Sequence, residues 1–169
     1  MSGRITSRWS EYFEQRRKIL VSQGFRGLST RWGTSYNMKV LQKAILDLHG
    51  CKAKWIESVP VKETFEGETV WEGVAEAFNF RDHPTGKRCY AWSHRIGHSR
   101  KRKFFAVLHE GPVKSARDAV RASIVGEFHK NKGKGWEGNI IYRGTSYIFY
   151  HYHRDRNHYD RSFVMDLGT

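Results

Sequence analysis

The sequence predicts an α+β fold with N-terminal helices, a mostly antiparallel sheet built on a three-stranded meander backed by a helix, and a C-terminal hairpin. Three observations support this fold class. Apolar residues recur at helical spacing before residue 50 and again after residue 115, whereas residues 69–110 alternate with the period of strands. Short turn-forming stretches separate the alternating segments, as in an antiparallel meander. The 6 Trp, 8 Tyr and 10 Phe residues supply a large apolar area, so the chain can bury a core.

The first expected helix lies in SRWSEYFEQRRKILVSQG, residues 7–24. Apolar side chains recur at helical spacing over residues 9–20, and Gly24 is suited to end the helix. The next stretch is rich in Gly, Ser and Thr, which is typical of a loop. We therefore divide the chain into an N-terminal helix and basic loop, residues 1–34, and a single globular α+β unit, residues 35–169.

A second helix is expected in SYNMKVLQKAILDLHG, residues 35–50, where an apolar stripe favours packing on a core and Gly50 favours a stop. The stripe consists of Met38, Leu41, Ile45 and Leu48, widened by Val40 and Ala44. After this helix the chain becomes extended, and Pro60 favours an edge strand or an irregular segment. The strands and turns of the meander are expected at residues 69–80, 81–87, 88–96, 97–103 and 104–110.

A third helix is expected within residues 111–130, where Ser115 is a good N-cap and Asp118 lies three residues later. The side chains expected to face the sheet are Ala119, Val120, Ile124, Val125 and Phe128. The order α-β-β-β-α over residues 36–129, together with KSARDAVRASIV, resembles the double-stranded-RNA-binding domain. The GxGxSKKxAK run of that family is absent, so no residue role is carried over. The sheet is also similar to DNA-binding domains that lay three strands in the major groove.

The last part of the chain predicts a hairpin over residues 136–155 with a turn near Arg143–Gly144, and FVMDL predicts a further short strand. Within the meander, His94 and His109 are expected to share a face with aromatic side chains. Those aromatic residues are Tyr90, Trp92 and Phe105. This face suits either base stacking or a core beneath the third helix, and the small residues opposite it favour the core.

Charge is segregated within the meander. Residues 57–82 hold seven acids and two Lys or Arg, whereas Lys87 to Lys103 include seven Lys or Arg and no acid. A first hairpin that turns at HPTG would place Glu72 opposite Arg95, and such cross-strand pairs favour one register.

The net charge of +13 indicates a polyanionic partner, and the abundance of aromatic residues favours nucleic acid, DNA or RNA. We expect a non-enzymatic protein that contacts mainly the phosphate backbone through the second meander turn, a basic glycine linker and the C-terminal tail. The candidate contacts are Arg95, His98, Arg100, Lys101, Arg102, Lys103, Lys130, Lys132, Lys134, Arg154, Arg156 and Arg161. The basic flank Arg16–Lys18 would assist. An adaptor or inhibitor that binds an acidic protein is an alternative.

A metal-dependent nuclease or nicking enzyme is the other alternative. His151 and His153 flank one residue, so on a strand both imidazoles point to the same side. The pattern resembles the His-hydrophobe-His motif of single-strand nicking enzymes of the HUH class, which implies a divalent metal ion and a tyrosine nucleophile. The candidate further ligands are Asp155, Asp160 and His158, and the candidate nucleophiles are Tyr159 and Tyr12. If the protein is not such an enzyme, we expect no cofactor.

The remaining features concern the compartment. Cys51 and Cys89 are far apart and form no CxxC, which excludes a cysteine zinc motif and favours reduced thiols. No apolar leader or membrane-length run is present, so an intracellular protein, cytoplasmic or in the nucleoid or nucleus, is expected.

Overall fold

The computed structural model describes residues 2–6, 9–22, 34–84, 86–95, 101–130, 136–149 and 162–166. The elements within these residues are β1 (Ser2–Thr6), α1 (Trp9–Ser22), α2 (Thr34–His49), β2 (Ala53–Phe65), β3 (Glu68–Phe80), β4 (Arg88–Arg95), β5 (Lys101–Leu108), α3 (Ala116–Lys130), β6 (Glu137–Tyr142), β7 (Thr145–Phe149) and β8 (Ser162–Asp166). The fold is α+β with a mostly antiparallel sheet, as the sequence predicts.

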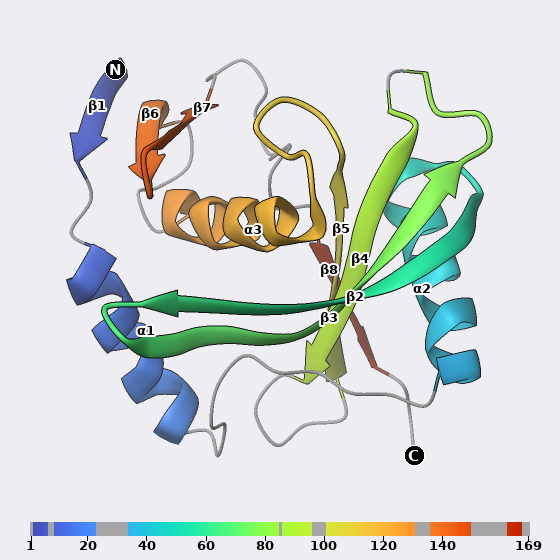
Figure 1. Ribbon diagram of the computed structural model, residues 1–169, viewed down its shortest axis with the longest axis horizontal. Helices are drawn as coiled ribbons and strands as arrows, with labels where there is room; N and C mark the ends of the chain where they lie inside the picture. The colour runs from blue at the N-terminus through green and yellow to red at the C-terminus, as the bar shows by residue number, and fades with distance from the viewer. Residues whose placement is uncertain are drawn as a thin grey trace.

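The central sheet has five strands in the order β2-β3-β4-β5-β8, and every neighbouring pair is antiparallel. Four of these strands are consecutive, so the meander is one strand longer than expected: β2 pairs with β3 along most of its length. Pro60 lies on the edge strand β2, where a missing N–H is tolerated. In Figure 1, α3 and α2 lie on opposite sides of this sheet.

The side of the sheet beneath α3 is an aromatic core. Trp92 and Phe105 stack with ring centroids 5.3 Å apart, and Tyr90 is also buried. All five α3 side chains that were expected to face the sheet are buried. His94 stacks on Phe105, and the Tyr90 hydroxyl is 2.8 Å from Nδ1 of His109. The histidine–aromatic face is therefore mainly core, which is the interpretation favoured by the small residues opposite it.

The opposite side of the sheet packs against α2. Leu41, Ala44 and Ile45 are buried against Phe78 and Phe104, which confirms the predicted apolar stripe. Because α2 covers this side and α3 the other, the central strands do not present an open face that would lie in a nucleic-acid groove. The arrangement of the central strands therefore does not support the resemblance to DNA-binding domains that place a sheet in the major groove.

The ends of two helices confirm local predictions. Gly50 ends α2 with a φ of 71°, and its N–H donates to the Leu46 carbonyl at 2.7 Å. At the start of α3, the Asp118 N–H donates to Ser115 Oγ at 3.1 Å, and Asp118 Oδ2 accepts from the Lys114 N–H at 3.1 Å.

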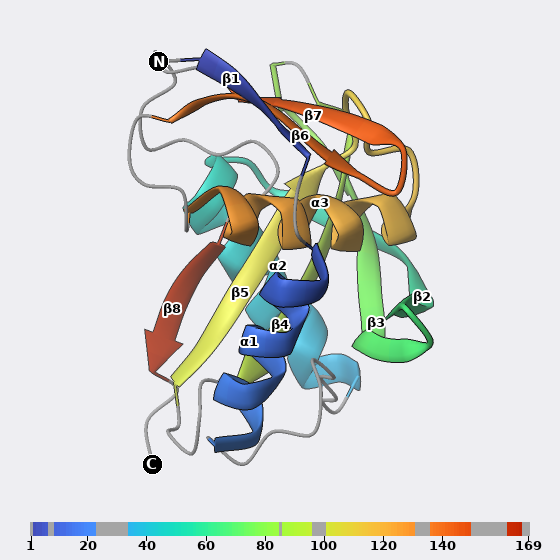
Figure 2. The same cartoon turned by 90° about the vertical axis from the view of Figure 1, so that its left-hand side faces the viewer.

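A second sheet has the order β1-β6-β7, with β1 parallel and β7 antiparallel to β6. Figure 2 shows this sheet above α3, with α1 in front of the central sheet. Trp9 on α1 joins these layers: its indole N–H donates to the Ile141 carbonyl at 2.7 Å, and its ring packs on Phe128. The β6–β7 turn falls at Arg143–Gly144, as predicted, and both residues have the positive φ of a two-residue hairpin turn.

Two expectations about the strands need correction, and one is confirmed. β1 was not expected, because Ile5 is the only large apolar residue in its five positions. The turn predicted at residues 97–103 is too long, since β5 begins at Lys101. β5 is extended there because it pairs with β4 on one side and β8 on the other. The short C-terminal strand expected from FVMDL is present as β8.

The register of the first meander hairpin is the predicted one, because Phe78 pairs with Cys89 and the Phe80 N–H donates to the Lys87 carbonyl at 2.9 Å. The expected Glu72–Arg95 pair does not form. The β3–β4 ladder extends only from Glu76 to Asn79 on β3, and Glu72 pairs with Lys62 of β2 instead. No helix in the described residues combines the length and apolar character needed to cross a membrane.

Candidate anion-binding surface

The predicted contact residues are only partly within the described chain. Side chains are described for Lys101, Arg102, Lys103 and Lys130, and the backbone alone for Arg95. The predicted nucleic-acid contacts outside the described residues are His98, Arg100, Lys132, Lys134, Arg154, Arg156 and Arg161. The candidate metal ligands and nucleophile His151, His153, Asp155, His158, Asp160 and Tyr159 also lie outside them.

The basic run of β5 is divided between the two sides of the sheet. Arg102 lies on the α2 side and donates to Ser93 from Nε to Oγ at 3.1 Å and from Nη2 to the carbonyl at 3.3 Å. Lys103 lies on the α3 side, with Nζ 5.1 Å from the centre of the Phe105 ring. Alternation along a strand therefore separates residues that the sequence presents as one patch.

The basic flank of α1 is neutralised by acids. Arg16 forms an ion pair with Glu127 of α3. Arg17 is 3.2 Å from Glu14 on its own helix and 3.0 Å from Glu68 at the start of β3. These contacts join α1 to neighbouring elements, so Arg16 and Arg17 have a structural role. The expected assistance of this flank in nucleic-acid binding stays a prediction.

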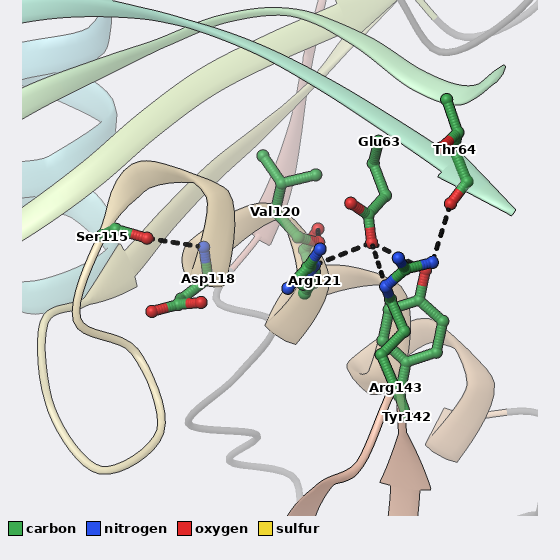
Figure 3. Close-up of polar contacts among 9 residues, drawn as sticks. Glu63, Thr64, Ser115, Asp118, Val120, Arg121, Tyr142 and Arg143 are labelled. Atoms are coloured by element: carbon green, nitrogen blue, oxygen red, sulfur yellow. Dashed lines mark hydrogen bonds and ion pairs between the residues drawn. The ribbon is translucent and has the colours of Figure 1, made fainter.

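A third group of charges, the Glu63 cluster, consists of Glu63, Arg121, Tyr142 and Arg143 (Figure 3). Oε2 of Glu63 accepts from Arg121 Nε at 2.8 Å and from the Tyr142 hydroxyl at 2.8 Å, and Arg143 Nε lies 4.0 Å away. Glu63 is 2% exposed, and its partners come from α3 and from the β6–β7 hairpin. The cluster therefore connects the two sheets through one buried carboxylate.

Proton affinities in the Glu63 cluster follow from burial and charge. Burial, followed by the negative charge and hydrogen bond of Glu63, raises the pKa of Tyr142 well above its ordinary value. Burial alone would lower the pKa of Arg121, but the hydrogen bond and charge of Glu63 outweigh it and raise that pKa. Both shifts keep the proton on Tyr142 and on Arg121, which is suited to a stable cluster and not to proton transfer.

A basic pocket of about 360 Å³ lies between α2 and the start of β2. It is lined by Gln42, Lys43 and Leu46 of α2, by Lys52, Ala53 and Lys54, and by Arg81. Two hydrogen bonds hold these segments together. Gln42 Nε2 donates to the Ala53 carbonyl at 3.2 Å, and the Arg81 N–H donates to the Lys52 carbonyl at 3.1 Å.

The four cations of the basic pocket, Lys43, Lys52, Lys54 and Arg81, are all exposed. Within the described residues none of them forms an ion pair with an acid, and no acid lines the pocket. A concave site lined by one sign of charge focuses the potential and attracts an ion of opposite charge. This geometry can hold an anionic group such as a phosphate.

Sequence reasoning missed the basic pocket because its cations are distant in the chain. In the sequence, Arg81 is one of two basic residues in an acidic segment, and no local pattern groups it with Lys43, Lys52 and Lys54. The pairing of Ala53 with Phe80 brings Arg81 beside Lys52. The available signal was the alternation of Lys52 and Lys54 directly after a helix that carries Lys39 and Lys43.

A metal centre finds no support among the described side chains, where no group of three or more His, Cys, Asp or Glu residues is arranged to hold an ion. Cys51 and Cys89 are free thiols. Burial raises the pKa of Cys89 far above its ordinary value, so its thiol is poorly reactive in the folded protein.

The chain was compared with protein-family models, curated proteins and solved structures, and none of them matches it.

Proposed function

We propose that this chain is a non-enzymatic nucleic-acid-binding protein that contacts mainly the phosphate backbone, with the basic pocket as one of its phosphate sites. The observation that carries this proposal is the set of four exposed cations that line one pocket without an acid partner among the described residues. The proposal keeps the basic residues at 95–103, 130–134 and 154–161 as further contacts.

The overall charge supports the same proposal. A net charge of +13 produces a positive potential that attracts polyanions. In the pocket the four cations repel one another, and no acid of the described residues lines the site, so a bound phosphate would reduce this repulsion. Phosphate binding also releases counterions, which favours association at low salt.

The proposal is tested by measuring the affinity of the purified chain for fluorescein-labelled nucleic acid over a range of salt concentrations. We expect the logarithm of the association constant to fall linearly with the logarithm of salt concentration, by about 0.7–0.9 for each phosphate contacted. Affinity that does not change with salt would contradict the proposal.

An acidic protein partner would show the same dependence on salt, so a competitor is required. Unlabelled polyglutamate, matched to the nucleic acid in total charge, should displace the labelled strand poorly, because its carboxylates are spaced differently from phosphates and it carries no bases. Equal displacement by polyglutamate would favour the acidic-protein alternative.

A further inference from the structure

We infer that the nucleic acid bound at the basic pocket is single-stranded, and that Trp55 is the surface on which one of its unpaired bases stacks. This inference rests on the proposed function and names the substrate class of the same site. It is carried by the way Trp55 is held, by its position beside the pocket, and by the charge of that pocket.

Trp55 is exposed yet fixed. The residue is 40% exposed, and its indole N–H donates to Glu76 Oε1 at 3.1 Å. Glu76 is 3% exposed and also accepts a hydrogen bond from the Ser58 hydroxyl. A buried carboxylate thus anchors the polar edge of the ring, while part of the ring remains accessible to solvent. An aromatic surface held in one orientation loses little entropy when it binds a flat ligand.

Trp55 lies next to the pocket and on the α2 side of the sheet. Ala53 lines the pocket and packs against the α2 core, and residues two apart on a strand share a face. The pairing of Trp55 with Phe78, a residue of the same core, agrees with this placement. The two positions are about 7 Å apart along the strand. A phosphate in the pocket and a base on Trp55 can therefore belong to one strand.

The apolar surroundings of this site also suit a base. Leu46, which lines the pocket, is an apolar side chain that is 42% exposed. Cations beside an exposed aromatic ring are the combination that binds single strands, since every base has a face that stacks. In a duplex those faces are covered by neighbouring bases, and Trp55 would then have no stacking partner.

The experiment compares a fluorescein-labelled oligothymidylate with an abasic strand of equal length, which carries the same phosphates but no bases. We expect the unaltered protein to bind the thymidine strand roughly 5- to 150-fold more tightly than the abasic strand. Trp55→Leu should remove most of this preference while keeping the affinity for the abasic strand. Trp55→Phe should retain part of it.

Ile148→Ala provides the matched control, because Ile148 is also exposed but lies on β7 of the other sheet. It should leave the preference for bases unchanged. Thermal unfolding of each variant confirms that the fold is intact, and Trp55→Phe serves in place of Trp55→Leu if the leucine variant does not fold.

Three results would overturn the inference: equal binding of the two strands by the unaltered protein, an unchanged preference in Trp55→Leu, or an equal loss of preference in Ile148→Ala. In each of these cases salt-dependent binding would leave the proposed function standing. If neither strand is bound at any salt concentration, the proposed function fails and the inference fails with it.

Discussion

The Glu63 cluster and the basic pocket both contain basic side chains, but these side chains have opposite surroundings. In the Glu63 cluster, Arg121 and Arg143 lie around a buried carboxylate that joins the two sheets. In the basic pocket, four exposed cations line a cavity that contains no acid. The net charge of the whole chain does not reveal this difference between the two regions. The difference teaches that the presence of acid partners, and not the number of cations, separates a basic residue that stabilises the fold from one that is available to a ligand.

The comparison predicts that substitutions in the Glu63 cluster reduce stability most. Glu63→Ala removes the shared acceptor and leaves Arg121 and the Tyr142 hydroxyl without it, so we expect the free energy of unfolding to fall by about 3 kcal/mol. Urea denaturation measures this change. Glu72→Ala, an exposed acid on the neighbouring strand, is the control and should cost less than about 0.5 kcal/mol. Equal costs would show that the Glu63 cluster does not stabilise the junction.

Tyr142→Phe tests the same cluster through pH. At neutral pH the loss of one hydrogen bond to a charged acceptor should cost about 1.5 kcal/mol. Because the pKa of Tyr142 is higher in the folded protein than its unfolded value near 10, the unfolded chain loses the proton first. The stabilisation is therefore complete below about pH 10 and is lost as pH rises above it.

Urea denaturation at about pH 9 and about pH 11 measures this dependence. The loss of stability between the two should be smaller in Tyr142→Phe than in the unaltered protein. Some loss remains, because burial also raises the pKa of Tyr90. An identical loss in both proteins would contradict the assignment to Tyr142.

Arg16→Gln has a smaller expected effect and separates stability from binding. Arg16 and Glu127 have side chains that are 17% and 18% exposed, so breaking their ion pair should lower the free energy of unfolding by about 1 kcal/mol. Affinity for nucleic acid should change less than about twofold, because this cation is already neutralised. The control is Lys18→Gln, whose side chain is 75% exposed and which should leave stability unchanged. A large loss of affinity in Arg16→Gln would show that the basic flank of α1 contributes to nucleic-acid binding.

The elements that sequence predicts well are those whose information is local. The apolar stripe of α2, the Ser115 cap of α3 and the Arg143–Gly144 turn each depend on residues a few positions apart. The register of the first meander hairpin was predictable for the same reason, since a short turn fixes it. The extent of the ladder was not, because β3 pairs with β2 along its whole length but with β4 only from Glu76 to Asn79.

The candidate site was less predictable because it depends on contacts between distant segments. The basic pocket requires α2, the start of β2 and the end of β3 to meet, which no local pattern encodes. The basic run at residues 101–103 was expected in a turn because GHSRKRK separates two segments that alternate like strands. Pairing of β5 with β8 and the hydrogen bonds from Arg102 to Ser93 instead hold it in a strand.

The pocket itself should show the smallest effect on stability and the largest on binding. Replacing Lys43, Lys52, Lys54 and Arg81 together by Gln removes four cations that have no acid partner among the described residues. The free energy of unfolding should therefore change by less than about 0.5 kcal/mol. In a control variant with the same loss of charge, four exposed lysines outside the pocket are replaced by Gln. These lysines are Lys18, Lys62, Lys87 and Lys114.

The most direct test is the slope of the logarithm of affinity for nucleic acid against the logarithm of salt concentration, measured for the unaltered protein, the pocket variant and the control variant. We expect the slope of the pocket variant to become shallower by about one unit, because the pocket no longer holds its phosphate, and the slope of the control variant to stay nearly unchanged. If the slopes of the two variants become shallower by the same amount, binding depends only on the net charge of the protein, and the basic pocket is not a phosphate site.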